Sequence, residues 1–338
     1  MTRKISTIGC AAILVAALAS AFMGTATAQD KKIVIAAPGI PPVFASTILY
    51  VAEKQGLFKK YGANVEVRAF DTGATASRAV IAGDVDISLS PSALLINQIS
   101  NTGAPVVAIY GISNTDFLLA TTDTAKTSCK DVAGQGVGVD VVGGARSIAL
   151  RIMLANGCPG VTIDNVQQVA LSSNVGAAML AGRLQFGVLH LDDVATLELQ
   201  GKKVNTLLTV NKTSPNNHYL VWIVRQDKLQ ANRDAYVRTM AALHEAAVFI
   251  HDPKNWDKAA EDASPTGLDK AVAKATIKPL LDIDYWPVND NGLDRKRLEG
   301  LIQVLKKTGG IMADKTPVTY ERLVDTSVWT DAVAMTKK

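Results

Sequence analysis

The same order of strands and helices occurs twice along this chain, and this repeat restricts the fold more than any other feature of the sequence. The apolar runs and their spacing predict strands at 33–37, 65–69 and 87–89 in the first copy, and at 137–139, 166–171 and 186–189 in the second. Helices are expected between them, at 44–56, 75–82, 145–155 and 174–181. Strands that alternate with helices form parallel sheets with right-handed crossovers. The sequence therefore predicts an α/β protein with two similar Rossmann-like lobes.

The connections between the copies predict how the lobes are joined. Two apolar extended segments, 114–123 and 219–226, lie where the chain passes from one copy to the other, so we expect it to cross twice. The expected first part of lobe 1 is 29–116, and lobe 2 is 117–226. Residues 227–338 have mainly amphipathic helical spacing, and we expect these helices to pack back on lobe 1.

The amino terminus has the pattern of a cleavable signal peptide. Arg3 and Lys4 precede an apolar run over 8–23, and Ala26-Thr27-Ala28 is a small-x-small cleavage motif. Cleavage after Ala28 would leave Gln29 as the first residue, with the mature protein in the periplasm. The alternatives are a single membrane anchor, for which the run is near the lower length limit, or a lipid on Cys10, which lies too early in the run.

Charge and composition exclude several classes of function. The formal charge of +4 becomes +2 without Arg3 and Lys4, so a strongly basic nucleic-acid surface is not expected. The four His residues do not have zinc-protease spacing, and the sequence has neither a Gly-x-Ser-x-Gly elbow nor a Gly-Lys-Ser/Thr phosphate loop. We therefore expect no enzyme, no cofactor and no metal site, although an exported enzyme of unknown reaction is an alternative.

Four stretches in this order resemble a known family: Gly56-Leu57-Phe58-Lys59-Lys60-Tyr61-Gly62, Ala82-Gly83-Asp84-Val85-Asp86 before Ser90-Pro91-Ser92, the stretch from Asp131 to Val139, and Gly292-Leu293 with 301–309. Behind a signal peptide, they are similar to the type II periplasmic solute-binding proteins of ABC importers that take taurine, alkanesulfonates, nitrate and thiamine pyrimidine precursors. The resemblance implies a ligand cleft between the lobes, closure about a hinge, and delivery to an ABC permease with its ATPase. It implies a monomer that needs no cofactor; service to a sensor instead of a transporter is the alternative partner.

The same resemblance places the two cysteines that follow the signal peptide. Export puts Cys129 and Cys158 in an oxidising compartment, where a structural disulfide is expected and two thiols are too few for a zinc site. In the implied fold, Cys129 precedes the first strand of lobe 2 and Cys158 follows the returning helix. Both ends then meet at the bottom of that lobe, away from the cleft.

Ligands of open α/β sheets bind beyond the carboxyl ends of the strands, so the residues after each expected strand are the candidate site. In lobe 1 the candidates are Ile40, Pro41, Phe44, Thr72, Gly73, Thr75, Ser90 and Ser92. In lobe 2 they are Gly143, Gly144, Arg146, Asn174, His190 and Asp192. Trp222, together with Tyr110 and Phe44, is a candidate aromatic wall, although such residues more often belong to a core.

These residue types favour no single ligand. The helix amino ends at Thr72-Gly73 and Gly143-Gly144, with Arg146, favour a carboxylate, sulfonate or phosphate. His190 and Asp192 favour an amine or a ring nitrogen. We expect an anionic or zwitterionic organic solute such as taurine or an aromatic carboxylate, with a thiamine pyrimidine precursor as the alternative.

Overall fold

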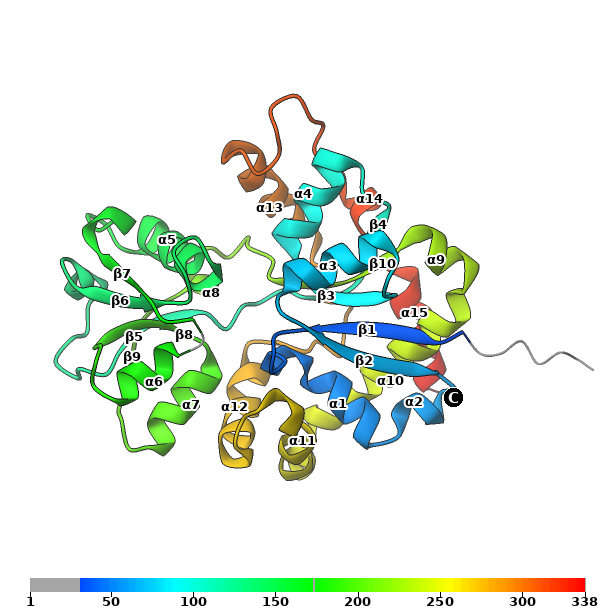
Figure 1. The fold of residues 1–338 in the computed structure, drawn as a ribbon, viewed down its shortest axis with the longest axis horizontal. Helices are drawn as coiled ribbons and strands as arrows, with labels where there is room; N and C mark the ends of the chain where they lie inside the picture. The colour runs from blue at the N-terminus through cyan, green and yellow to red at the C-terminus, as the bar shows by residue number, and fades with distance from the viewer. Residues whose placement is uncertain (1–30, 173, 338) are drawn as a thin grey trace, which may run out of the picture. The chain divides into compact units, whose positions relative to one another are not determined.

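The computed structural model of this protein contains two five-stranded mixed sheets, which confirms the expected two-lobe α/β fold. It describes residues 31–172 and 174–337 (Figure 1). The expected signal peptide and Ser173 lie outside the described residues. We use lobe 1 for the sheet with order β2-β1-β3-β10-β4 and its helices, and lobe 2 for the sheet with order β7-β6-β8-β5-β9 and its helices.

The strands and helices follow the sequence pattern closely. Lobe 1 has the strands β1 (Ile33–Pro38), β2 (Val65–Phe70), β3 (Ile87–Pro91), β4 (Val106–Ile112) and β10 (Leu220–Arg225). Lobe 2 has β5 (Leu118–Thr121), β6 (Gly136–Val139), β7 (Gln167–Ala170), β8 (Phe186–Leu189) and β9 (Asn205–Thr209). The helices up to the second crossing are η1 (Phe44–Ser46), α1 (Thr47–Lys54), α2 (Leu57–Lys60), α3 (Gly73–Ala82), α4 (Ser92–Thr102), η2 (Cys129–Val132), α5 (Ala145–Gly157), η3 (Ile163–Asn165), α6 (Val175–Leu180), α7 (Leu191–Leu199) and α8 (Val210–Thr213). The later helices are α9 (Gln226–Ala231), α10 (Arg233–His251), η4 (Pro253–Asn255), α11 (Trp256–Asp262), η5 (Ser264–Thr266), α12 (Lys270–Asp282), α13 (Arg295–Lys307), α14 (Tyr320–Leu323) and α15 (Ser327–Thr336).

Each sheet is covered on both faces, and the alternation of side chains along the strands shows why. In β1, Ile33 and Ile35 pack into the core below α1 and α10, whereas Ala36 packs on the opposite face below α3 and α4. In β5, Leu119 faces α5 and Leu118 faces α6 and α7. The apolar runs of the sequence therefore become strands that are buried on both faces.

The two crossing segments enter the sheets as antiparallel strands. After the first crossing, β5 pairs with β8 and β9 in lobe 2. After the second crossing, β10 pairs with β3 and β4 in lobe 1. The other pairings, β1 with β2 and β3, and β6 with β7 and β8, are parallel. The carboxyl ends of β1–β3 and β6–β8 therefore lead into the loops that carry the candidate site.

The carboxyl-terminal helices pack mainly on lobe 1. Helices α10 and α15 pack together, and α10 also contacts α1 and α2. Between α12 and α13, the segment 283–294 runs past the end of β4. Gly111 and Gly292 approach so closely there that a Cβ on Gly111 would lie 2.3 Å from the carbonyl oxygen of Gly292.

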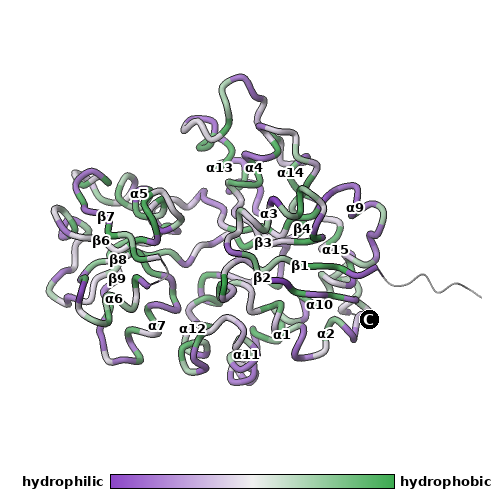
Figure 2. The backbone as a smooth tube through the Cα atoms, in the orientation of Figure 1, coloured by the Kyte–Doolittle hydropathy of each residue, from purple (hydrophilic) through white to green (hydrophobic). Residues whose placement is uncertain are grey.

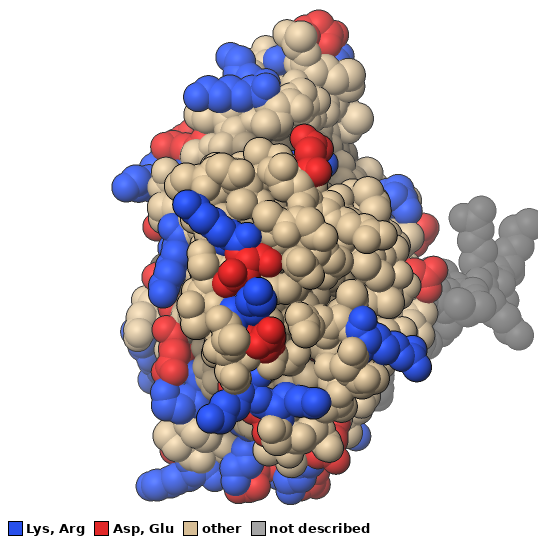
Figure 3. All heavy atoms as spheres, turned by 90° about the vertical axis from the view of Figure 1, so that its left-hand side faces the viewer, with Lys and Arg blue, Asp and Glu red and all other residues tan. Residues whose placement is uncertain are grey.

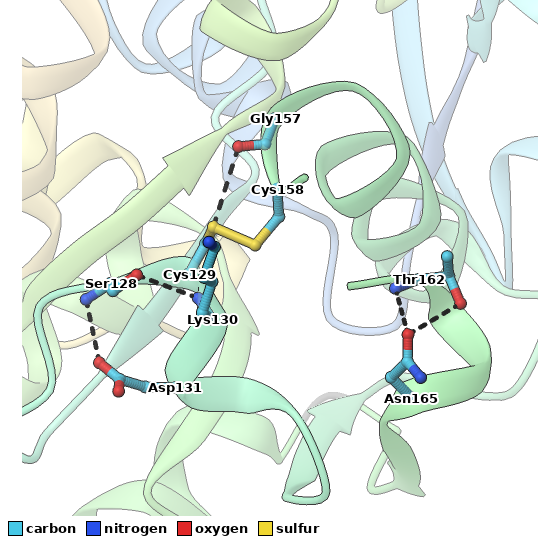
Figure 4. Close-up of a disulfide and its surroundings, with 8 residues drawn as sticks. All are labelled: Ser128, Cys129, Lys130, Asp131, Gly157, Cys158, Thr162 and Asn165. Atoms are coloured by element: carbon cyan, nitrogen blue, oxygen red, sulfur yellow. Dashed lines mark hydrogen bonds between the residues drawn. A yellow bond between two sulfur atoms is a disulfide. The ribbon is translucent and has the colours of Figure 1, made fainter. Parts of the chain in front are cut away.

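The disulfide expected between Cys129 and Cys158 is present. The two Cα atoms are 5.9 Å apart and the residues are separated by 29 positions (Figure 4). Cys129 opens η2 before β6, and Cys158 caps the carboxyl end of α5. The bond therefore ties the start of the lobe-2 α/β unit to the end of its first helix.

The surface and the core separate clearly by polarity. In Figure 2 strand β1 is coloured hydrophobic, and hydrophilic stretches occur mainly in the outer loops and turns. On the lobe-2 face of Figure 3, basic and acidic side chains are interspersed instead of forming one patch of a single sign. Within the described residues, no helix combines the length and the apolar character that crossing a membrane requires.

Candidate functional site

Asp116 and His190 form a pair where the first crossing segment meets the end of β8. Because Leu118 pairs with Leu189, the residues just outside this antiparallel pair lie at the same end of the sheet. His190 Nδ1 lies 2.9 Å from Asp116 Oδ2, and the Asp116 side chain is only 8% exposed. Burial alone would lower the pKa of His190, but the charge and hydrogen bond of Asp116, together with the charge of Asp192, raise the pKa above the usual 6.5. Burial of Asp116 opposes its interaction with His190, and the net pKa of this carboxyl lies below its usual value.

Arg146 and Asp193 form a second pair beside the first. The Arg146 Nη1 atom donates to Asp193 Oδ2 at 2.7 Å and to the carbonyl oxygen of Val188 at 2.7 Å. The same Asp193 oxygen accepts from the backbone N–H of His190 at 3.0 Å, which caps α7. A Cβ on Gly176 would lie 2.5 Å from Asp193 Oδ1, so only a glycine at this position of α6 leaves room for the Asp193 carboxylate. The guanidinium charge is thus already balanced within the protein.

Asp192 is the third acid of this cluster, and its environment disfavours the ionised form. Burial, followed by the neighbouring charge of Asp193, raises its pKa to about 6. We call the five residues Asp116, Arg146, His190, Asp192 and Asp193 the acidic cluster. Its three carboxyl groups outnumber its one guanidinium, so the cluster is negative near neutral pH even when His190 is protonated. The cluster offers hydrogen-bond acceptors, and Asp116 Oδ1 is buried without a hydrogen-bond partner in the described structure.

Aromatic side chains continue from this cluster toward lobe 1. The ring of Phe117 lies 4.3 Å from the ring of His190 and 5.6 Å from that of Tyr219, between centroids. The ring of Tyr219 in turn lies 6.2 Å from the ring of Tyr285, between centroids. Burial, together with the charges of Asp116 and Asp192, raises the pKa of both Tyr219 and Tyr285. Acceptors with adjacent aromatic faces suit a ring or a cation that carries N–H donors.

The comparisons with known proteins agree with this architecture. A family model described as "NMT1/THI5 like" matches residues 43–255, which is more than half of the chain. The chain belongs to the NMT1/THI5-like family.

Individual relatives show how far this likeness reaches. A Brucella abortus (strain 2308) protein named "Putative binding protein" is 25% identical over 217 residues, or 62% of this chain and 65% of that relative. The chain therefore matches just under two thirds of the length of that relative. The structure also resembles the periplasmic aliphatic sulphonate binding protein SsuA from Escherichia coli, with a TM-score of 0.65, 16% identity, and coverage of 87% of this chain and 92% of SsuA. The periplasmic nitrate-binding protein NrtA from Synechocystis PCC 6803 gives a TM-score of 0.66 at 15% identity, with coverage of 91% and 89%. These likenesses confirm the family resemblance and the fold predicted from the sequence.

Within this NMT1/THI5-like chain, the predicted glycine loop of lobe 2 already has a carboxylate of its own. A Cβ on Gly144 would lie 2.6 Å from both carboxylate oxygens of Asp140, so this acid sits against the amino end of α5. The backbone N–H of Gly143 donates to Ser147 Oγ at 2.9 Å. Asn174 lies exposed at the amino end of α6. Asp140 beside Gly144 and Asp193 paired with Arg146 therefore offset the positive potential on which the predicted anion preference of this loop was based.

The lobe-1 candidates fall into an accessible and a buried group. Ile40 and Pro41 are exposed in the loop after β1, and Thr72 and Thr75 cap the amino end of α3, which begins at Gly73. Ser90 is fully buried at the end of β3, and its hydroxyl has no partner in the described structure. Ser92 is also buried, and its Oγ bonds to His218 Nδ1 at 2.7 Å.

The expectation that Trp222, Tyr110 and Phe44 form an aromatic wall of the site is wrong, because all three side chains are buried in the lobe-1 core. Trp222 is fully buried, Tyr110 is 1% exposed, and Phe44 packs against Trp286 in the lobe-1 core. The reason is that β10 lies inside the sheet, between β3 and β4, so helices cover both of its faces. Tyr219, at the start of the second crossing, is a partly exposed aromatic residue beside the acidic cluster and is not among the residues predicted to bind the ligand.

A separate cavity of about 690 Å³ lies at the opposite end of the lobe-1 sheet. Its walls include Val107 at the start of β4, Arg233 and Arg295. Both arginines pair with acidic side chains, and the cavity is remote from the carboxyl ends of the parallel strands. Among the described residues no group of three His, Cys, Asp or Glu side chains is arranged to hold a metal.

The substitution Asp192→Asn is expected to stabilise the protein at about pH 7.5 by about 1 kcal/mol. Because folding raises the pKa of Asp192 to about 6, ionisation costs free energy in the folded state. The free energy of unfolding of the parent should fall as the pH rises from the ordinary pKa of 3.8 to the folded-state pKa of about 6, and then level off. Urea denaturation of both proteins across this pH range measures the effect. The gain should vanish toward about pH 3, where the carboxyl is largely protonated in both states; a gain of equal size at all pH values would contradict the assignment.

Proposed function

We propose that this protein is the extracytoplasmic solute-binding subunit of an ABC uptake system, and that its solute is a small organic molecule with a basic nitrogen. The family and the two-lobe fold support the binding role. The acidic cluster supports the choice of solute, because it combines a net negative charge with an unpartnered buried acceptor, Asp116 Oδ1. A cation or an N–H donor balances that charge and fills that acceptor, whereas a bare anion does neither.

The aromatic side chains near the acidic cluster narrow the chemical class of the solute further. Tyr219 lies partly exposed beside the acidic cluster and offers a ring face to a flat or cationic group, and the buried Phe117 packs between it and His190. An aminopyrimidine of the thiamine-precursor type combines a flat ring with N–H donors. Taurine supplies an ammonium group without a ring. Nitrate and simple alkanesulfonates supply neither a ring nor an N–H donor. The aliphatic sulphonate binding protein SsuA and the nitrate-binding protein NrtA nevertheless share this fold.

In the proposed mechanism, the solute enters between the lobes and contacts groups from both. Contacts made only in the closed form shift the population of the protein toward that form. The closed protein then delivers the solute to a permease in the membrane, and the partner ATPase supplies the energy. The mature protein works in the periplasm after removal of residues 1–28.

A thermal-shift panel on refolded, ligand-free protein tests the solute class. The panel contains 4-amino-5-hydroxymethyl-2-methylpyrimidine, taurine, methanesulfonate, nitrate and benzoate. A ligand present at about 100 times its dissociation constant adds roughly 2.7 kcal/mol, so the melting temperature should rise by several degrees. We expect the largest shift with the aminopyrimidine.

Calorimetric titration of matched variants then tests the site. Asp192→Asn should weaken binding of the active compound at least about tenfold, because it removes a charged hydrogen-bond acceptor. Asp164→Asn is the control, since Asp164 is an exposed acid elsewhere on lobe 2. A response restricted to nitrate or methanesulfonate, with normal affinity in Asp192→Asn, would overturn the proposed solute class.

A further inference from the structure

The amino end of α5 faces solvent at the loop that follows β6. Gly143 and Ala145 are exposed, and Gly144, the residue that precedes the helix, has no side chain that could cap it. The first N–H groups of an α-helix lack acceptors within the helix, and the helix dipole adds positive potential at this end. An exposed helix end without a cap therefore favours an anion.

Acceptors within the protein satisfy the loop but not the first turn of α5. The N–H of Gly143 donates to Ser147 Oγ at 2.9 Å, and the N–H of Gly144 donates to the carbonyl oxygen of Val141 at 2.9 Å. No side-chain hydrogen bond caps this helix end in the described part of the chain. The positive potential of the first turn, from Ala145 onward, is therefore left for a charge outside the helix.

The side chain of Asp140 places a negative charge at this end. Both of its carboxylate oxygens lie 2.6 Å from the position that a Cβ on Gly144 would occupy. Its Oδ1 atom is buried and has no hydrogen-bond partner in the described structure. The backbone of Asp140 is held independently of the side chain, because its carbonyl oxygen accepts from the N–H of Ser172 at 2.8 Å. The carboxylate thus occupies the place of an anion without making the hydrogen bonds of a cap.

Helices α3 and α7 show the bonds that a polar side chain makes at a helix start of this fold. Thr72 Oγ1 accepts from the N–H of Thr75 at 3.1 Å at the start of α3, and Asp193 Oδ2 accepts from the N–H of His190 at 3.0 Å at the start of α7. Within the described residues, no bond of this kind joins the Asp140 carboxylate to α5. Its negative charge nevertheless repels any second anion that comes within a few ångströms.

We propose that Asp140 is a specificity-determining residue that keeps anionic solutes away from the amino end of α5. Its carboxylate fills the position that a nitrate, sulfonate or carboxylate group would take there, and its charge adds to that of the negative acidic cluster. A binding protein can discriminate by an unfavourable charge against the wrong solute as well as by contacts to the right one. The proposal rests on the proposed solute class and deepens it, because it assigns the exclusion of anions to one residue.

Substitution of Asp140 should turn an excluded anion into a ligand. Asp140→Asn removes the charge and keeps most of the volume, whereas Asp140→Ala removes both. We expect methanesulfonate to bind Asp140→Ala at least about tenfold more tightly than the parent, because a like charge a few ångströms away no longer opposes it. Asp140→Asn should show a smaller gain. Nuclear magnetic resonance titration at constant ionic strength, with chloride as the reference anion, measures the affinities, and shifts of the Gly144 and Ala145 amide signals locate the anion.

Asp164→Ala is the matched control, since Asp164 is an exposed acid of η3 in the same lobe, and it should leave methanesulfonate binding unchanged. Asp140→Asn carries the test alone if Asp140→Ala folds poorly. Parent-like anion binding in the folded Asp140 variants, or an equal gain in Asp164→Ala, would overturn the inference. A gain at α5 supports the role of Asp140 even if no basic compound binds the parent. Binding of a basic compound without such a gain would overturn the role of Asp140 and leave the proposed function standing.

Discussion

Replacement of Gly111 by alanine should lower the free energy of unfolding by about 4 kcal/mol. The added Cβ would lie 2.3 Å from the carbonyl oxygen and 2.8 Å from the carbonyl carbon of Gly292, and both are backbone atoms. That backbone cannot easily retreat, because Ser113 and His218 hold the same carbonyl and Asn291 O accepts from Gly111 N–H at 2.8 Å. Relief of the clash therefore requires the loss of hydrogen bonds to both crossing segments. Urea denaturation followed by circular dichroism measures the change.

Gly136→Ala is the matched control for this substitution. Gly136 is also a strand residue, but a Cβ there would meet only the side-chain methyl groups of Leu184 and Val169, each at 3.4 Å. These flexible ends can move by a few tenths of an ångström, so the change in the free energy of unfolding should be under about 1 kcal/mol. If both alanine variants lost the same stability, the close approach of Gly111 and Gly292 would not be the cause.

Removal of the disulfide, with both Cys129 and Cys158 replaced by alanine, should cost about 3.5 kcal/mol. The bond closes a loop between residues 29 positions apart, and cross-linking over that length reduces the conformational entropy of the unfolded chain. The double variant avoids leaving a single reactive thiol. Urea denaturation of parent and variant, with and without dithiothreitol, provides the measurement. The reductant should destabilise the parent by a similar amount and leave the double variant unchanged; a parent insensitive to a reductant that demonstrably cleaves the bond would contradict the prediction.

The sequence predicted the fold because its signals are local. Each strand of the repeat is a short apolar run, each helix has amphipathic spacing, and the order of the two determines the parallel pairing. The observed α3 begins at Gly73 and α5 ends at Gly157, within a few residues of the expected bounds. The disulfide followed from the same order, because a strand and its returning helix bring their outer ends together.

The candidate site was only partly predictable, because its remaining members depend on contacts between distant segments. His190 and Asp192 could be found, since each directly follows a strand. Asp116 could not be found in the same way: it enters the site through the antiparallel register of β5 on β8, which no local pattern specifies. The available signal was an acid directly before the apolar run 117–120 of the first crossing segment. Tyr285 comes from the segment after α12 and meets Tyr219 only through packing of the carboxyl-terminal helices on lobe 1.

The placement of β10 also has a consequence for how the chain acquires its structure. All strands of the lobe-2 sheet lie within one continuous stretch, from β5 to β9. The lobe-1 sheet, in contrast, lacks the strand between β3 and β4 until residues 220–225 have been made. A chain that grows from its amino end can therefore complete lobe 2 first. Until β10 is made, the edges of β3 and β4 that will pair with it have no partner strand. Any factor that shields nascent chains from aggregation would have to cover those two edges until the chain has crossed back.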